Sequence, residues 1–228
     1  MINFDNCRKQ LYSAVISDIL DSMTMLNQVL DPDIRPVDES KILCGLARVG
    51  LYYPIYHDDE TVNVYEHELK LIDSLRPNEI PVLVCHGLKH IAPWGELLST
   101  RACYLKAGGC ITDGSVRDVR MIREMGFPVY ARSFSPLDTK YRGKLLWSDI
   151  PGKIGGVNVK TGDLIFDDFL LIDEKVYKKF DDIPYTGEMK IANGKDKFWM
   201  ITNYKSGIPH GLYRRFFLDG TLMETGMY

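Results

Sequence analysis

The sequence predicts an α/β fold with a mixed sheet, followed by a small β-rich appendage toward the C-terminus. Three observations predict it. Residues 80–131 alternate strand, helix, strand, helix and strand, which indicates parallel pairing with right-handed crossovers. Residues 133–174 change to short strands and turns, so the sheet should be mixed and not purely parallel. Beyond residue 176 the chain is aromatic-rich and strand-like, with turn dipeptides at Asn193–Gly194, Ser206–Gly207 and Asp219–Gly220.

The composition is that of an ordinary globular protein. The chain has 228 residues, of which 45% are hydrophobic and 26% are charged, and its net charge is −3. This length is enough to bury a substantial core, and the charge gives no general electrostatic reason to bind nucleic acid or a membrane. No apolar run approaches the roughly 20 residues that a membrane span needs. We therefore expect neither nucleic acid nor a membrane among the partners.

The cysteines and the first residues bear on the compartment. The five cysteines form no C-x-x-C pair, and four lie in apolar runs, where free cysteine behaves as a small hydrophobic residue. This pattern argues against a disulfide framework or a structural zinc site and favours a reducing compartment. The opening MINFDNCRKQ is polar, so we expect no secretory signal peptide and a cytoplasmic protein. The cysteines are Cys7, Cys44, Cys85, Cys103 and Cys110.

The first 53 residues are predicted to hold a helix, a loop and strands. Ser13 is the predicted N-cap of a helix with an apolar stripe. Residues 30–37 contain two prolines and are predicted to form an extended loop. Residues 42–53 are apolar and interrupted by glycines, which predicts strands with bends or bulges. The helical stripe consists of Val15, Ile16, Ile19, Leu20 and Met23.

Two more helices and a strand are predicted next. The stretch HDDE at residues 57–60 predicts the start of a helix, and residues 80–86 form an apolar run typical of a strand covered on both faces. Trp94 to Ala107 forms a second amphipathic helix, which ends at Gly108–Gly109. The predicted buried stripes are Val62, Tyr65, Leu69 and Ile72 in the first helix, and Leu97, Leu98, Ala102 and Leu105 in the second.

The chain is organised around residues 108–132. Residues 110–112 are predicted to form a short buried strand, and residues 113–115 a turn that contains a carboxylate. A helix is predicted to begin at Arg117–Asp118 and to end before a second strand at 128–131. In an open α/β sheet, the loop just beyond the carboxyl end of a strand is where ligands bind.

Two predicted loops carry the polar residues that could perform chemistry. One follows the strand at 81–86 and the other follows the strand at 110–112, so both open on the same edge of the sheet. Glu96 and Asp118 then face one crevice, each near a helix N-terminus that favours anions. Few carboxylates and no cysteine or histidine cluster favour Mg²⁺ or Mn²⁺ over Zn²⁺. Arg117 offers a planar charged group that suits a substrate carboxylate.

The residue types alone leave simpler interpretations open. Asp118 could be an N-cap and Arg117 a solvated surface charge, while Glu96 could be an ordinary acid in the first turn of a helix. His86 and His90 favour structural or exposed positions over metal ligation, because their spacing of four spans a predicted loop and not a helix.

Several separated motifs lie between residues 10 and 173. They are SAVISDILD and IRPV near the start, then WGELLSTRA, AGGCITDGSVRDV, FPVYAR and GGVNVKTGDLIFDD. In this order and spacing they resemble the family of ribonuclease-regulator A proteins and 4-hydroxy-4-methyl-2-oxoglutarate aldolases. The resemblance implies a mixed-layer α/β/β sandwich that assembles into homotrimers or hexamers, with sites at the subunit interfaces.

The resemblance also implies roles for individual residues. In aldolase members the arginine of the R-D pair binds the substrate carboxylate and the aspartate ligates Mg²⁺ or Mn²⁺, which implies these roles for Arg117 and Asp118. The acid of the G-D/E-L-L motif, Glu96, would hold metal-bound water and assist proton transfer. Backbone amides of the same segment would meet the pyruvyl group. The residues implied in substrate binding beside Arg117 are Gly95, Leu97 and Leu98.

The sequence departs from the family pattern in two places. After Gly162–Asp163 the family usually continues toward D-x-D-G and a run of valines, whereas this chain has DDFL at residues 167–170. Family members also take an acid from a neighbouring subunit, near their C-terminus, and no counterpart can be placed here. Regulator members can lack the R-D aspartate. This chain keeps Asp118, which favours a competent metal site.

The C-terminal part resembles a different kind of protein, a β-hairpin repeat. Residues 175–187 are charged and contain a proline, which predicts a linker, so the predicted domains are 1–175 and 176–228. Residues 203–228 resemble one unit of a MORN-type repeat variant found in antitoxin-like proteins, and 185–199 a degenerate half-unit. Each unit would be a β-hairpin. A lone hairpin is marginal in water, so this tail should serve as a structural staple or as a surface for a protein partner.

Two functions remain in competition. The leading hypothesis is a class II, divalent-metal-dependent carbon–carbon lyase, which cleaves a 4-hydroxy-2-oxo acid or oxaloacetate to pyruvate through a metal-stabilised enolate. Its partners would be a small 2-oxo acid and further copies of the chain. The competing hypothesis is a non-catalytic regulatory or protein-binding member of the family, which uses the ring-shaped scaffold and the tail.

Overall fold

The computed structural model describes most of the chain as two compact units. The larger is Phe4–Glu174 and the smaller contains the last four strands. No helix of the described part is long and apolar enough to cross a membrane. The described residues are 2–57, 61–167, 169–171, 187–193, 197–205, 208–216 and 221–227.

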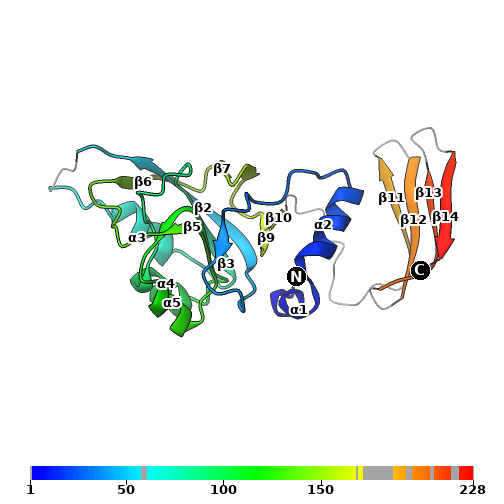
Figure 1. Ribbon diagram of the computed structural model, residues 1–228, viewed down its shortest axis with the longest axis horizontal. Helices are drawn as coiled ribbons and strands as arrows, with labels where there is room; N and C mark the ends of the chain where they lie inside the picture. Colours follow the sequence, from blue (N-terminus) through cyan, green and yellow to red (C-terminus); the bar gives the residue numbers. More distant parts are fainter. Residues whose placement is uncertain are drawn as a thin grey trace. The chain divides into compact units, whose positions relative to one another are not determined.

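The larger unit consists of short helices and strands. Its helices are α1 (Phe4–Gln10), α2 (Ser13–Ser22), α3 (Glu66–Asp73), α4 (Glu96–Tyr104) and α5 (Val119–Met125). Its strands are β1 (Arg35–Pro36), β2 (Cys44–Pro54), β3 (Glu79–Val84), β4 (Cys110–Val116), β5 (Val129–Phe134), β6 (Gly143–Ser148), β7 (Gly152–Ile154), β8 (Val157–Val159), β9 (Leu164–Phe166) and β10 (Phe169–Leu171). The longest of these, β2, passes through the middle of the sheet (Figure 1).

The central sheet has eight strands and is mixed, as predicted. Its order is β1-β5-β4-β3-β2-β9-β10, and β6 also pairs with β2. Strands β2, β3, β4 and β5 run parallel to one another, because the alternation of strands and helices returns the chain to the same edge each time. Strands β1, β6, β9 and β10 pair antiparallel. The predicted α/β fold with a β-rich completion is confirmed.

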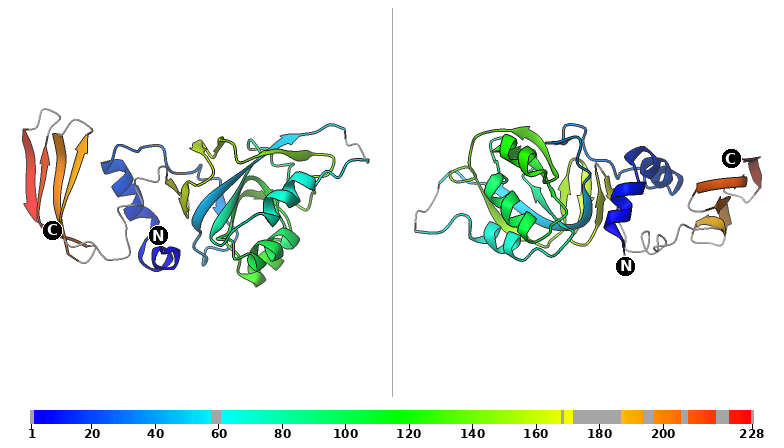
Figure 2. Two further views of the ribbon diagram at one scale, coloured as in Figure 1. Left: turned by 180° about the vertical axis from the view of Figure 1, so that it is seen from behind. Right: turned by 90° about the horizontal axis from the view of Figure 1, so that it is seen from below.

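The sheet is covered on both faces. Helices α3, α4 and α5 lie together on one side of it (Figures 1 and 2), and the β7–β8 ribbon covers the other. Alternate residues of the strands fill the two cores, since successive side chains of a strand point to opposite faces. The helix-side core includes Leu71, Ile72, Leu83, Ala102, Cys110, Ile122 and Val129. The ribbon-side core includes Val49, Val82, Ile111, Ile154, Val157 and Val159.

Three predictions for the first part of the chain need correction. Ser13 is the first residue of α2 and not its N-cap; its hydroxyl donates to Asp167 Oδ2 at 3.3 Å. Residues 42–53 form one strand where several were predicted: β2 runs unbroken from Cys44, and the predicted bulge lies between Leu51 and Tyr52, where its register against β6 shifts. Helix α3 begins only at Glu66, and residues 58–60 of the predicted start lie outside the described residues.

The predicted apolar stripe of α4 is also partly wrong. Leu97 is 74% exposed, whereas Leu98 is half-buried and Ala102 is fully buried. The reason is a polar contact: the indole N–H of Trp94 donates to the hydroxyl of Ser99 at 2.7 Å, and both side chains are buried. This contact turns the Ser99 side of the helix toward the core and leaves Leu97 in solvent.

The smaller unit is a four-stranded antiparallel sheet. The strands pair in the order β11-β12-β13-β14, so consecutive hairpins are joined into one sheet. The predicted turns include residues 194, 206–207 and 219–220, which lie outside the described residues, as does the predicted domain boundary at 175/176. The strands are β11 (Gly187–Asn193), β12 (Lys197–Lys205), β13 (Ile208–Phe216) and β14 (Leu222–Met227).

Candidate functional site

The two predicted loops meet at the carboxyl end of β4. Trp94, just before α4, forms a parallel bridge with Val116, the last residue of β4. The backbone N–H of Arg117 donates to the carbonyl of Trp94 at 3.0 Å. The start of α4 therefore lies directly beside the link between β4 and α5, which brings residues about 20 positions apart into contact.

Asp118 joins these two segments. It occupies the N-cap position of α5 in the left-handed conformation, with φ 55° and ψ 33°, but its side chain does not cap that helix. Its Oδ2 instead accepts the backbone N–H of Glu96 at 3.2 Å and Nε of Arg117 at 3.3 Å. The simple N-cap interpretation is therefore wrong for its side chain, which binds the first N–H group of the neighbouring helix α4.

Gly95 permits this close approach. Its backbone is extended, with φ −160°, so its conformation alone does not require glycine. The space does: a Cβ atom at this position would lie 2.8 Å from Cγ of Arg117 and 2.8 Å from Oδ2 of Asp118. A side chain here would have to displace both charged groups.

Arg117 lies between two carboxylates. In addition to its contact with Asp118, its Nη1 lies 3.2 Å from Oδ2 of Asp138, which also accepts the hydroxyl of Tyr65 at 3.0 Å. Burial works against the arginine charge, but the hydrogen bond and the charge of Asp118, with those of Asp138, outweigh it and raise the pKa of Arg117. Its side chain is 35% exposed. Arg117 is therefore not the freely solvated surface charge that remained possible from the sequence.

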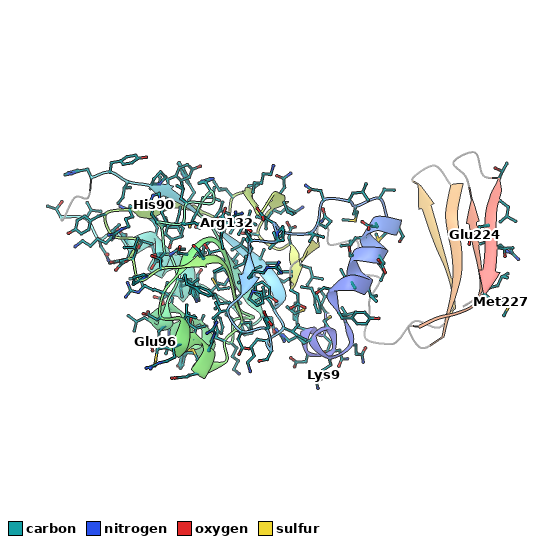
Figure 3. All side chains as sticks on the ribbon, in the orientation of Figure 1. Lys9, His90, Glu96, Arg132, Glu224 and Met227 are labelled. Atoms are coloured by element: carbon teal, nitrogen blue, oxygen red, sulfur yellow. The ribbon has the colours of Figure 1, made fainter. Side chains whose placement is uncertain are left out.

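Glu96 contributes its main chain to the contact with Asp118. Its carboxylate lies along α4, where the Thr100 hydroxyl is 3.4 Å from Oε1. Figure 3 places Glu96 beside α4 and α5 and well apart from His90. The interpretation of Glu96 as a first-turn acid fits its position, and the same position puts its backbone against the Arg117–Asp118 pair.

A shallow pocket of about 400 Å³ opens at this point. It lies at the carboxyl ends of β4 and β5, where the crevice was expected. Arg117 and Asp118 are among its lining residues, whereas Gly95, Glu96, Leu97 and Leu98 are not. The lining consists of Val116, Arg117, Asp118, Val119, Phe134, Ser135 and Pro136.

The structure adds a buried acid that the sequence did not reveal. Glu68, in the middle of α3, is buried and accepts the hydroxyl of the fully buried Tyr52. Burial raises its pKa to about 7, although the hydrogen bond from Tyr52 opposes the shift. The predicted stripe of this helix is only partly correct: Ile72 is buried, but Leu69 is exposed, and Leu71 is buried together with Glu68.

The remaining polar residues of the two loops are not part of this contact. Asp113 is a strand residue and not a turn residue; it accepts the backbone N–H groups of Cys85 and Gly87, so it fixes the turn after β3. Burial raises its pKa. His86 is exposed and packs against Tyr53, with ring centroids 4.8 Å apart. Its contact is structural, as the sequence favoured.

The acids near Arg117 form at most a minimal cation site. In the described part of the chain, no three acidic, histidine or cysteine side chains gather in a way that could hold a metal ion. Asp118, whose side chain is 38% exposed, presents a carboxylate to the pocket. Mg²⁺ is commonly held by one or two protein carboxylates and keeps several waters. The carboxylate of Asp118, with Glu96 nearby in the chain fold, matches a site in which the protein supplies only one or two carboxylate ligands.

Known proteins match most of the chain in sequence. The profile of the RraA-like family, described as Aldolase/RraA, matches residues 13–169. The "Putative 4-hydroxy-4-methyl-2-oxoglutarate aldolase" of Halalkalibacterium halodurans is 28% identical over 171 residues, 73% of each chain. Protein DlpA of Legionella pneumophila is 28% identical over 156 residues, which are 68% of this chain but 25% of DlpA. The chain thus spans only a quarter of that relative.

Solved structures show the same fold. RraAS2 of Streptomyces coelicolor, described as an unusual member of the RNase ES inhibitor RraA family, superposes with a TM-score of 0.65 at 19% identity, over 77% of this chain and 86% of that one. A chain described as a novel cellulase from gut-associated microbes gives 0.71 at 23% identity, over 78% and 82%. These likenesses establish the mixed α/β fold. By its sequence match over residues 13–169, the protein belongs to the RraA-like family.

Proposed function

We propose that the protein is a divalent-metal-dependent aldolase or decarboxylase that releases pyruvate from a 4-hydroxy-2-oxo acid or from oxaloacetate. One observation carries the proposal: the Asp118 carboxylate is held between the N–H of Glu96 and the guanidinium of Arg117 at an open pocket. A carboxylate that can bind a cation, beside a guanidinium that can bind a carboxylate, is a pair suited to a 2-oxo acid. The family also includes proteins named as aldolases.

Arg117 would bind the substrate carboxylate. Its guanidinium is permanently charged and planar, so the N–H groups that do not face Asp118 and Asp138 can donate to a carboxylate. The N-terminal turn of α4 would meet the 2-oxo group, since the first N–H groups of a helix have no partner within it. Glu96 donates its N–H to Asp118, which leaves the amides of Leu97 and Leu98 for this role. Gly95 would keep the approach open.

Asp118 would be the metal-binding side chain, and Glu96 would move the proton. A bound Mg²⁺ or Mn²⁺ ion would supply Lewis-acid stabilisation of the negative charge that develops next to the carbonyl group. In cleavage of the hydroxy acid, the 4-hydroxyl proton leaves, the C3–C4 bond breaks and C3 gains a proton. In decarboxylation, CO₂ leaves and C3 gains a proton. Glu96, a carboxylate at the start of α4, would serve as the base and acid in these transfers.

We also propose that the site is completed by assembly into a trimer or hexamer. The described residues near Asp118 supply few ligands, and an acid from a neighbouring subunit would raise their number. The RraA-like relationship supports an oligomer of this type.

The test is pyruvate release. The protein should produce pyruvate from oxaloacetate or from 4-hydroxy-4-methyl-2-oxoglutarate in the presence of Mg²⁺ or Mn²⁺, above the rate of the metal ion alone. Asp118→Ala should abolish the release while the protein stays folded. Asp73→Ala is the matched control, because it also removes an aspartate–arginine pair, here with Arg101 at 2.8 Å, on helices beside the site.

Two results would reject the proposal. The first is a wild-type protein that releases no pyruvate from either substrate with either metal ion. The second is an Asp118→Ala variant that works as fast as the Asp73→Ala control. EDTA should remove the wild-type activity, and its persistence in EDTA would reject the dependence on a metal ion.

A second function is supported by the C-terminal sheet. Strands β11–β14 lie beyond residues 13–169, which the family profile matches. We propose for this sheet, with its resemblance to MORN-type repeats, a role in binding a protein partner. If this were the main function, deletion of residues 187–228 would remove partner binding in pull-down experiments, while pyruvate release would be absent from the full chain.

A further inference from the structure

Asp138 stands out because nothing in the sequence connects it to the R-D pair. It lies in the loop between β5 and β6, 21 residues after Arg117, and both of its oxygens are used. Oδ2 contacts Nη1 of Arg117 at 3.2 Å and accepts the Tyr65 hydroxyl at 3.0 Å. Oδ1 accepts the hydroxyl of Thr139 at 3.2 Å and the N–H of Lys140 at 3.3 Å. The carboxylate is therefore held in one orientation.

The loop that carries Asp138 is itself braced. The N–H of Ser135 donates to the carbonyl of Val116 at 3.0 Å, which ties the loop to the end of β4. The guanidinium of Arg142 donates to the carbonyls of Asp138 at 3.4 Å and of Lys140 at 3.2 Å. The position of the carboxylate thus depends on the loop backbone as well as on its direct partners.

The charge of Asp138 is maintained at neutral pH. Burial favours the neutral form, but the hydrogen bonds from Tyr65 and from the backbone, together with the charge of Arg117, hold the pKa of Asp138 below its usual value. Burial and the contact with Asp138 raise the pKa of Tyr65 to about 12, so its hydroxyl stays protonated and can donate.

Two carboxylates fix two different edges of the guanidinium. Asp118 lies at Nε and Asp138 at Nη1. A guanidinium presents its five N–H donors in one plane, so two fixed contacts define the orientation of that plane. Among the described residues, Nη2 of Arg117 has no hydrogen bond with a carboxylate, and this part of the fork remains available to a ligand.

We propose that Asp138, supported by Tyr65, is a positioning residue that orients the Arg117 guanidinium for the carboxylate of the substrate. The inference rests on the proposed function for the identity of that ligand, but not for the contact itself. A flexible arginine would lose its freedom only on binding, whereas a pre-oriented one has already lost it, and pre-orientation increases affinity. Asp138 does not touch the reacting atoms and acts through Arg117.

The experiment uses the full-length protein and follows Arg117 directly. Its guanidinium N–H signals in ¹⁵N NMR spectra, those of Nη1 as well as Nε, are assigned as the signals lost in Arg117→Lys, and their hydrogen-exchange rates are measured. Asp138→Asn should speed the exchange and should weaken Mg²⁺-dependent pyruvate binding roughly 10-fold, the size expected for one lost hydrogen bond to a charged group. In steady-state kinetics the change should appear in KM more than in kcat.

Two further variants complete the design. Tyr65→Phe keeps the Asp138 charge but removes one of its donors, so it should change both readouts in the same direction by about 3-fold. Asp149→Asn is the matched control: Asp149 lies 3.0 Å from Nε of Arg48, and it is 43% exposed against 40% for Asp138. It removes a comparable aspartate–arginine pair, made with Arg48 and not with Arg117, and should change neither readout.

Unchanged exchange of the Arg117 signals in Asp138→Asn overturns the inference, whatever the activity of the variant. Faster exchange in Asp138→Asn and Tyr65→Phe, but not in Asp149→Asn, supports it. Absence of pyruvate release by the wild type would end the proposed function and leave the NMR result intact. The two claims can thus fail separately.

Discussion

Two hollows lie at opposite ends of the parallel strands. The one at the carboxyl ends of β4 and β5 has a volume of about 400 Å³ and contains Arg117 and Asp118. The one before the amino ends of β3, β4 and β5 is larger, about 530 Å³. Its charged lining residues are all cations. They are Arg8, Lys41 and Lys106.

The larger volume and the three cations of the second hollow do not by themselves favour it for the proposed chemistry. In the larger hollow, Arg8 donates to the carbonyl of Cys44 at 2.6 Å and to Oδ1 of Asn78 at 3.1 Å, so its charge fastens α1 to the sheet. The smaller hollow combines the carboxylate of Asp118 with the guanidinium of Arg117, so groups of opposite charge can contact one ligand together.

The largest expected effect concerns the buried acid near the smaller hollow. Glu68 has a folded-state pKa of about 7 against 4.5 for the ordinary group. Because the folded-state pKa of Glu68 is raised, its ionisation lowers the free energy of unfolding as the pH rises from about 4.5 to 7. Above pH 7 the free energy of unfolding stays at this lowered value. A shift of this size corresponds to about 3 kcal/mol.

Glu68→Gln removes this titration and keeps an acceptor for the Tyr52 hydroxyl. The variant should match the wild type near pH 4.5 and exceed its free energy of unfolding by up to about 3 kcal/mol at pH 8. Urea unfolding at several pH values measures the difference. A gap that does not grow between pH 4.5 and 8 would show that the raised pKa is wrong.

The next prediction compares two glycines, Gly95 beside the smaller hollow and Gly108 in the lining of the larger one. In Gly95→Ala the new methyl group would displace Arg117 and Asp118, and we expect pyruvate release to fall about 100-fold, since small misplacements at a reacting centre have effects of this size. In Gly108→Ala the methyl group would lie 2.8 Å from the Cys44 carbonyl. This change should lower stability by about 1–3 kcal/mol but leave the activity of the folded protein intact.

Thermal unfolding and kcat/KM, measured for both glycine variants, separate the two outcomes. The contrast fails if Gly108→Ala loses activity while still folded, or if Gly95→Ala keeps it.

A smaller effect is expected from Arg117→Lys. Lysine keeps the positive charge but lacks the planar fork that can contact two carboxylates and a ligand together. KM for oxaloacetate should rise about 10-fold, with a smaller change in kcat. A KM equal to that of the wild type would show that charge alone is sufficient at this position.

The smallest effect is expected at the larger hollow. Lys106→Ala removes one of its cations, and pyruvate release should stay within about 2-fold of the wild type, as for most surface substitutions. A large loss of activity would move the functional site to the amino ends of the strands.

Local patterns predicted much of the fold. The order from β3 to β5 was correct because each element there has an apolar run or stripe, and Gly126 ends α5 in the left-handed conformation, with φ 71°. The stripes failed where a polar side chain entered the core. Ser99 and Glu68 are buried through contacts with Trp94 and Tyr52, and no period of apolar residues could show these contacts.

The contacts of the candidate site were predicted in part. Arg117 and Asp118 followed from their place after a strand and from the family resemblance, and the structure brings the start of α4 against them. Asp138 and Tyr65 were missed because their hydroxyl–carboxylate contact joins segments 73 residues apart. Tyr65 was predicted as a member of an apolar stripe, and that pattern takes account of its ring but not of its hydroxyl group. Pairings of this kind depend on loop geometry and leave no local signal.

The central claim is that Asp118 holds a divalent cation that a 2-oxo acid joins, and ligand-dependent stability tests it most directly. The shift in the thermal unfolding midpoint with Mg²⁺ and pyruvate should be compared in the wild type and in Asp118→Ala. At ligand concentrations of about 100 times Kd, the wild type should gain about 2.7 kcal/mol of stability. The variant should gain none. An equal shift in both proteins would contradict the account.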